Sequence, residues 1–179
     1  MSKKLIIMTD IGDTIIDETT EIRKRSLRHP EGIVQTAQCI PGAKETILKL
    51  YDAGYTIVMV ADGYTESFHN TMKLNGLDHI FSAWITSEQV GIQKPSAHMF
   101  EAAMDTMHLT DSDKSRIIMV GNHVRKDIGG ANRFGIRSVQ IDWSKRHPYI
   151  PSCAEEQPTY LIHTPEELFP LCEKLESEL

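Results

Sequence analysis

The stretch that decides the fold is residues 5–14, LIIMTDIGDT, in which an apolar run ends in polar residues and a glycine. The run from Leu5 to Met8 is continuously apolar, which is typical of a short strand buried on both faces. Asp10 follows the run almost at once. Because open α/β sheets bind ligands beyond the carboxyl ends of their strands, the stretch predicts a first strand with a polar site at its end.

Similar apolar runs recur along the rest of the chain, with helical patterns between them. The runs that predict strands are residues 56–60, 83–86, 116–120, 136–141 and a weaker 159–162. Apolar side chains at helical spacing predict helices over residues 42–53, 65–74, 97–107, 124–134 and 165–175. This alternation favours right-handed crossovers between parallel strands. The predicted fold class is α/β, with a Rossmann-like, doubly wound and mainly parallel sheet.

The size and composition of the chain indicate one folded domain. The chain has 179 residues, of which 40% are hydrophobic and 25% are charged. These values exclude disorder and collagen-like repeats, so we expect a single domain over residues 1–179. Residues 17–39 break the alternation, and we interpret them as a short flap. Its basic side chains either attract an anionic substrate or remain solvated. They are Arg23, Lys24, Arg25 and Arg28.

Charge and residue usage exclude several classes of partner. The net charge of −6, from 25 acidic and 19 basic residues, argues against non-specific binding to nucleic acid. No apolar run approaches the roughly 18 residues of a membrane span, so we expect no membrane partner and a cytoplasmic location. Three cysteines without a CxxC pair favour a reducing compartment without a disulfide framework. Nothing in the spacing of the histidines indicates a zinc site.

Polar residues gather at the predicted carboxyl ends of the strands, and each has a catalytic and a structural interpretation. Asp10 can attack phosphorus when a cation offsets the repulsion from the substrate, or it can open a turn with Gly12. Lys94 can neutralise phosphate oxygens, or it can be a solvated loop lysine. Asn122 and Asp127 can offer oxygen ligands to Mg²⁺, and Asn122 can also cap the following helix.

Four ordered motifs resemble those of the haloacid dehalogenase-like (HAD-like) hydrolase superfamily. They are residues 5–14, residues 57–63 (IVMVADG), Lys94-Pro95, and residues 117–122 (IIMVGN) with Asp127 and Gly130-Ala131. The resemblance covers essentially residues 4–142. It implies the HAD-like form of the doubly wound fold and a Mg²⁺-dependent phosphatase that works through an aspartyl-phosphate.

The resemblance also implies roles for individual residues. Asp10 would be the nucleophile, and Lys94 would steady the anion. The residues that would form or support the Mg²⁺ site are Asp10, Gly12 through its backbone carbonyl, Asn122 and Asp127. The residues that would contact the substrate are Ala61, Asp62, Gly63 and Lys94. In phosphoryl transfer, positioning and charge neutralisation of this kind supply most of the catalysis.

The chain departs from the superfamily pattern at three positions. Gly12 stands where phosphatases of the superfamily usually have a second aspartate that protonates the leaving group, and Asp13 comes one residue later. General acid–base help is worth roughly 10²–10⁴-fold, so its loss favours substrates with good leaving groups, such as acyl and aryl phosphates. Whether Asp13 replaces the missing acid is left open by the sequence. Ala61 replaces a phosphate-binding hydroxyl residue, and Asn122 supplies a neutral oxygen in place of a charged one.

The chain is too short for the cap domains of the superfamily, so the predicted site is open. About 46 residues separate Thr14 from Ala61, and most of them belong to the flap and the first helix. Capless members either act on bulky substrates or have a neighbouring subunit that closes the site. We therefore expect a small phosphorylated substrate or a phosphate exposed on a larger molecule, and a homo-oligomer is one way to complete the site.

Two alternative functions remain. The losses at Gly12 and Ala61 suit a catalytically weakened module that binds phosphate or a partner. Gly12 and Asn122 also resemble the dehalogenases of the superfamily, which displace halide without Mg²⁺, although those enzymes need a lid that this chain lacks. Residues 142–148 follow the fifth predicted strand, so they either contact substrate at the same edge or pack Trp143 beneath the last strand and helix.

Overall fold

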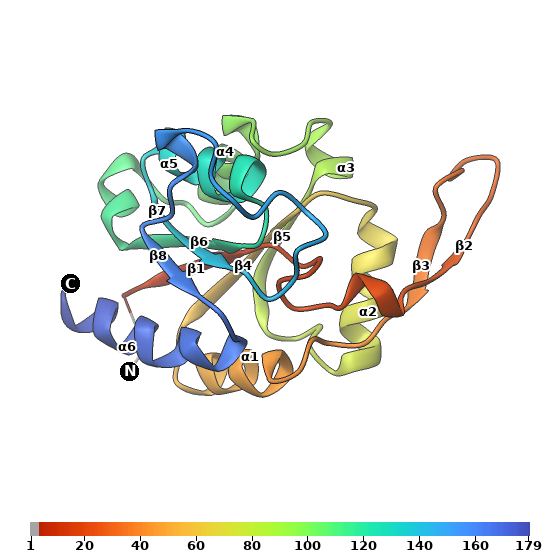
Figure 1. Cartoon of the computed structure of the whole chain (residues 1–179), viewed down its shortest axis with the longest axis horizontal. Coiled ribbons are helices and arrows are strands. Elements are labelled where there is room, and N and C mark those ends of the chain that lie inside the picture. Colours follow the sequence, from red (N-terminus) through yellow and green to blue (C-terminus); the bar gives the residue numbers. More distant parts are fainter. Residues whose placement is uncertain (1–3) are drawn as a thin grey trace.

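The computed structural model describes residues 4–179 and contains one six-stranded sheet in which every pairing is parallel (Figure 1). Its strands in spatial order are β5 (Phe81–Thr86), β4 (Thr56–Ala61), β1 (Ile6–Thr9), β6 (Ile117–Gly121), β7 (Arg137–Ile141) and β8 (Tyr160–Ile162). The predicted α/β class and parallel sheet are confirmed, and each strand lies within two residues of its predicted position.

Strand β1 lies in the middle of the sheet and explains why its sequence is apolar throughout. Met8 pairs with Val58 of β4 on one side and with Met119 of β6 on the other. Its side chains point alternately to two hydrophobic cores, one on each face of the sheet. Because no face of β1 meets solvent, a strand with alternating polar residues would not fit here.

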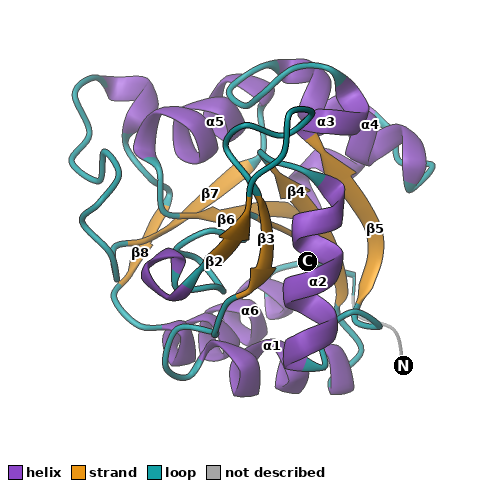
Figure 2. Cartoon of the chain, turned by 90° about the vertical axis from the view of Figure 1, so that its right-hand side faces the viewer, coloured by secondary structure: helices purple, strands orange, loops and turns teal. Residues whose placement is uncertain are grey.

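Helices cover both faces of the sheet (Figure 2). One face packs against α1 (Ala43–Asp52), α2 (Thr65–Asn75) and α6 (Leu168–Ser177). The other face packs against α4 (Ala97–Thr106) and α5 (Gly129–Phe134). The shorter helical segments are η1 (Glu18–Thr20), α3 (Ser87–Val90), η2 (Asp111–Arg116), η4 (Ala154–Glu156) and η5 (Pro165–Glu167). The doubly wound arrangement is therefore as predicted.

The helix predicted over residues 124–134 begins with a π-helical turn, η3 (Val124–Ile128), before α5. Single π turns inside helices are frequent at functional sites. Here the turn places the Asp127 side chain against Gly121, since a Cβ at Gly121 would lie 2.4 Å from Asp127 Cγ. A glycine at the end of β6 is thus needed for Asp127 to reach the carboxyl end of the sheet.

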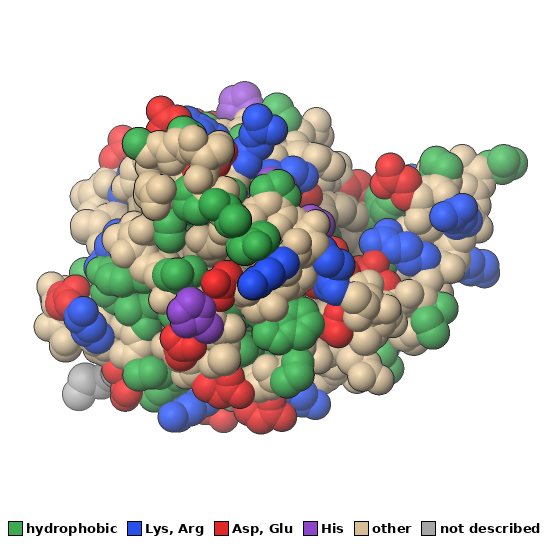
Figure 3. Space-filling view, viewed as in Figure 1, with side chains coloured by type: hydrophobic (Ala, Val, Ile, Leu, Met, Phe, Trp, Pro, Cys, Tyr) green, Lys and Arg blue, Asp and Glu red, His purple; other side chains and the backbone are tan. Residues whose placement is uncertain are grey.

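The flap predicted over residues 17–39 contains a β-hairpin that projects from the body of the protein (Figure 1). Its antiparallel strands are β2 (Ile22–Lys24) and β3 (Ile33–Thr36). The base of the hairpin is tied to α2, because the Ser67 hydroxyl accepts a hydrogen bond from the Val34 backbone N–H. Basic side chains lie along the projecting arm (Figure 3), and Leu27 near its tip is fully exposed.

Within residues 4–179, the segment between β1 and β4 holds only η1, the hairpin and α1, so no large cap domain is inserted there. The three cysteines, Cys39, Cys153 and Cys172, are all free. No helix in the described part of the chain is long and apolar enough to cross a membrane.

Candidate active site

A cleft of about 520 Å³ lies at the carboxyl ends of the central strands. Seven of the eight predicted site residues line it: Asp10, Gly12, Asp62, Gly63, Lys94, Asn122 and Asp127. The opposite wall comes from the hairpin and the segment before it, through Glu18, Glu21, Arg23, Glu31 and Val34. The carboxyl ends of parallel strands therefore meet at one site, as the sequence predicts.

Lys94 lies at the centre of the site, with its side chain 1% exposed. Its ammonium donates to Asp10 Oδ1 at 2.7 Å and to the backbone carbonyl of Val60 at 2.8 Å. It also pairs with Asp127 Oδ1 at 2.7 Å. Two hydrogen bonds and one ion pair therefore surround the ammonium. Lys94 consequently holds the two carboxylates and is not a solvated loop lysine.

Asp10 is the accessible member of this group. Its side chain is 15% exposed, against 1% for Lys94 and 2% for Asp127. Its backbone N–H donates to the carbonyl of Val120, which fixes the residue at the end of β1. Asp10 Oδ1 is engaged by Lys94, so Oδ2 is the oxygen that remains for a substrate or a cation.

Burial and neighbouring charges shift the pKa values of Asp10 and Lys94. Burial raises the pKa of Asp10 to about 7 against the attraction of Lys94, and the nearby carboxylate of Asp127 adds to the increase. Burial disfavours the charged form of Lys94, but the carboxylates around it raise its pKa above the ordinary lysine value. Two buried carboxylates thus share one ammonium, and an additional cation would stabilise the ionised form of Asp10.

The oxygen groups fit a hard cation such as Mg²⁺. Asn122 is 2% exposed and lines the cleft together with Asp10 and Gly12. With Asp10 and the Gly12 backbone it would offer the oxygen donors that Mg²⁺ prefers. Both oxygens of Asp127 are already engaged, one by Lys94 and the other by the His123 backbone N–H at 3.0 Å. Asp127 is therefore suited to supporting such a site and less to direct ligation.

The predicted substrate-binding residues Ala61, Asp62 and Gly63 differ in their access to the cleft. Asp62 and Gly63 line the cleft, whereas Ala61 is buried at 1% exposure and lies outside the cleft lining. Asp62 is occupied by an ion pair with Lys126 at 3.0 Å. The Gly63 N–H donates to the hydroxyl of Ser87 at 2.9 Å. Sequence reasoning missed Ser87, although its position directly after β5 places it at the same edge of the sheet.

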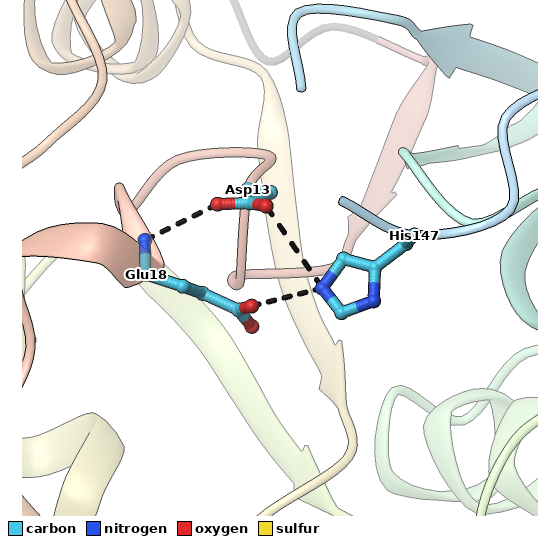
Figure 4. A group of neighbouring side chains, drawn as sticks. All are labelled: Asp13, Glu18 and His147. Atoms are coloured by element: carbon cyan, nitrogen blue, oxygen red, sulfur yellow. Dashed lines mark hydrogen bonds and ion pairs between the residues drawn. The ribbon is translucent and has the colours of Figure 1, made fainter. Parts of the chain in front are cut away.

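A second group of side chains consists of Asp13, Glu18 and His147 (Figure 4). Asp13 is fully buried with a φ of +50°, and its Oδ1 accepts a hydrogen bond from the Glu18 N–H. Its carboxylate also pairs with Arg146. Asp13 lies outside the lining of the cleft, among the residues described, so it is not placed to act as the missing acid. Glu18 and His147 do line the cleft.

Residues 142–148 reach this edge of the sheet, and His147 is the residue of this stretch that lines the cleft. Trp143 packs against the hydrophobic core, which is the structural alternative given by the sequence. His147 instead approaches the site, with Nε2 2.8 Å from Glu18 Oε2. No local pattern in the sequence indicates this pairing, because the two residues come from loops that are far apart in the chain.

The fold is a doubly wound α/β sheet, and the candidate site lies at the carboxyl ends of its strands. Residues 6–141 match the family described as haloacid dehalogenase-like hydrolase. The chain belongs to this family.

This chain spans about half the length of the curated relatives that it matches. A ribulose-1,5-bisphosphate 5-phosphatase of Halopiger xanaduensis is 31% identical, over 72% of this chain and 54% of its own. A glyceraldehyde 3-phosphate phosphatase of Methanothermobacter thermautotrophicus is 29% identical, over 57% of this chain and 44% of its own. The (S)-2-haloacid dehalogenase 4A of Burkholderia cepacia is 26% identical, over 75% and 55%.

A solved structure shows the same fold over the whole chain. The putative HAD-hydrolase YfnB of Bacillus subtilis has a TM-score of 0.73 and 17% sequence identity, and the match covers 96% of this chain and 99% of that one. At this identity the likeness concerns the fold alone.

Proposed function

We propose that this protein is a phosphatase that forms an aspartyl-phosphate on Asp10. The observation that carries the proposal is the group formed by Asp10, Lys94 and Asp127, in which Asp10 alone is appreciably exposed to the cleft. The phosphatase names of the relatives from Halopiger and Methanothermobacter support the class of reaction.

The residues of this chain divide the work in the proposed reaction. Asp10 Oδ2 bonds to phosphorus as the bond between phosphorus and the leaving oxygen breaks. Lys94 holds Asp10 Oδ1 and offsets the charge of the carboxylate, and Asp127 fixes Lys94 in turn. Mg²⁺ held by Asp10, Asn122 and the Gly12 carbonyl would supply further positive charge near the phosphate. Water then cleaves the acyl phosphate, which restores Asp10 and releases phosphate.

The shape of the site supports a broad class of substrates. The cleft is bounded by the hairpin and has no cap domain over it among residues 4–179. We propose a phosphate monoester that is either a small phosphorylated compound or a phosphate exposed on a larger molecule. Position 12 carries no acid, so aryl phosphates, whose leaving groups need no proton, are the first substrates to test.

Turnover of an aryl phosphate in the presence of Mg²⁺ tests the proposal directly. We expect hydrolysis by the native protein, a loss on addition of EDTA, and no detectable turnover by Asp10→Asn. Asp105→Asn, which changes an exposed carboxylate on α4, is the matched control and keeps full activity. If Asp10→Asn and the native protein hydrolyse the ester at the same rate, the proposal is wrong.

A module that binds phosphate without turnover is the second candidate. It is favoured by the contacts that already hold the Lys94 ammonium and by the hydrogen bond from Gly63 to Ser87, since both groups must exchange partners to contact a substrate. Calorimetry with inorganic phosphate and Mg²⁺, beside the turnover assay, separates the two candidates. Release of chloride from 2-chloropropionate in EDTA would instead indicate a dehalogenase.

A further inference from the structure

The backbone at Gly12 is covered by a carboxylate from elsewhere in the chain. A Cβ at Gly12 would lie 2.1 Å from Glu18 Oε1 and 3.0 Å from Glu18 Cδ. Real Cβ atoms do not approach other atoms this closely, so the Glu18 carboxylate occupies the space in which a side chain at position 12 would begin. The residue two positions after Asp10 has no acid of its own, yet an acid lies directly over it.

Glu18 is oriented and still accessible. Its Oε2 lies 2.8 Å from Nε2 of His147, while Oε1 is the oxygen that faces Gly12. The side chains of Glu18 and His147 are 32% and 36% exposed, and both line the same cleft as Asp10. A hydrogen bond of this length from an imidazole fixes one carboxylate oxygen and leaves the other to face the cleft.

Asp13 supports this arrangement but does not share its access. It is fully buried, and its charge is balanced by Arg146. Its Oδ1 accepts from the Glu18 N–H at 3.1 Å, which anchors the start of η1 and hence the Glu18 side chain. His147 Nε2 lies 3.9 Å from Asp13 Oδ2, farther than from Glu18. Asp13 therefore helps to position Glu18 and His147, and Glu18 is the residue of this pair that lies over Gly12.

We propose that Glu18 is the general acid–base group of the site and that His147 is its positioning residue; this inference rests on the proposed phosphatase function. As the phosphorus–oxygen bond of the substrate breaks, its electron pair stays on the leaving oxygen, which takes the proton from the Glu18 carboxyl. In the second step the Glu18 carboxylate takes a proton from the attacking water. The bond between phosphorus and Asp10 then breaks, and Glu18 is again protonated.

This role predicts that the effect of Glu18 depends on the leaving group. For Glu18→Gln we expect kcat/KM to fall by about 10²–10⁴-fold on an alkyl phosphate such as glycerol phosphate. On 4-nitrophenyl phosphate, whose leaving group needs no proton, we expect a loss of less than about 10-fold. The ratio kcat/KM excludes the later water step, so it isolates proton donation. Glu66→Gln, an exposed carboxylate on α2, is the matched control with an unchanged ratio.

A rescue experiment tests the placement of the carboxylate separately from the fold. Gly12→Asp alone forces the Glu18 carboxylate to move aside, so it changes two carboxylates at once. In the Glu18→Ala background the same aspartate has room, and Gly12→Asp/Glu18→Ala should exceed both Glu18→Ala and Gly12→Ala/Glu18→Ala on the alkyl ester. His147→Gln should lower alkyl turnover less than Glu18→Gln does, with the same dependence on the leaving group.

The possible failures are distinguishable. If the native protein hydrolyses both esters but Glu18→Gln lowers both equally, or neither, then Glu18 has no role in proton transfer while the phosphatase proposal stands. If Gly12→Asp/Glu18→Ala folds and is no better than its alanine counterpart, the placement over Gly12 carries no function. If the native protein and Asp10→Asn are equally inactive on both esters, the proposed function itself is wrong.

Discussion

The cleft has a buried side, formed by Lys94 and Asp127 with Asp10, and an exposed side, formed by Glu18 and His147. On one side Lys94 and Asp127 are almost completely buried, and the ammonium is held by two hydrogen bonds and an ion pair. On the other side Glu18 and His147 are about one-third exposed and are held by one hydrogen bond between loops. The buried side resists rearrangement and fixes the nucleophile, whereas the exposed side is free to respond to the leaving group.

Removal of the buried ammonium should have the largest effect on stability. Lys94→Met leaves Asp10 and Asp127 close together without their shared cation, so we expect the free energy of unfolding to fall by about 3–5 kcal/mol and turnover to disappear. Urea unfolding in EDTA measures the first effect. Lys126→Met, which removes a lysine that is 33% exposed, is the control and should cost less than about 1 kcal/mol. Equal losses in the two variants would contradict the contrast between the two sides.

Replacement of Asp10 should raise the free energy of unfolding, whereas replacement of Lys94 should lower it. The pKa of Asp10 rises from 3.8 to about 7 on folding, so its protonated form favours the fold below pH 3.8 and this contribution is lost as the pH passes 7. At pH 8 in EDTA, Asp10→Asn should therefore be more stable than the native protein, by up to about 4 kcal/mol at about 1.36 kcal/mol per pKa unit.

The difference in stability between Asp10→Asn and the native protein should depend on pH, and this dependence is the control. Thermal unfolding at pH 4 should give nearly equal Tm values for Asp10→Asn and the native protein, since Asp10 is then largely protonated in the folded state. Mg²⁺ at pH 8 should raise the Tm of the native protein more than that of the variant. A variant that is less stable than the native protein at pH 8 would show that ionised Asp10 carries no cost.

The exposed side should contribute least to stability. A pair as exposed as Glu18 and His147 is worth about 0.2–1 kcal/mol, so Glu18→Gln should change the free energy of unfolding by less than about 1 kcal/mol. Urea unfolding beside Lys94→Met measures this difference. A loss as large as that of Lys94→Met would mean that Glu18 holds the fold together and would remove the contrast on which its catalytic role depends.

The buried side was predictable from the sequence, and the exposed side was not. Asp10, Asn122 and Asp127 follow apolar runs, and parallel strands bring such positions to one edge of the sheet. Lys94 reaches the same place from the loop before α4. The alternation of strands and helices predicts parallel strands and hence this shared edge, whereas the π-helical turn that completes the placement of Asp127 has no such signal.

The position of Glu18 depends on contacts between distant loops. Its carboxylate reaches Gly12 because Asp13 turns away at φ +50° and accepts the Glu18 N–H, while His147 arrives from the loop after β7. None of these contacts has a periodic signal. The sequence shows that an acid is missing at position 12, but only the tertiary structure shows what lies over that position.

The close approach at Gly12 also constrains how the sequence can change over generations. An aspartate at position 12 and the Glu18 carboxylate would compete for the same space, so one of them must move aside when both are present. Homologues of this chain should accordingly carry either the pair found here or its exchange, and rarely both acids together.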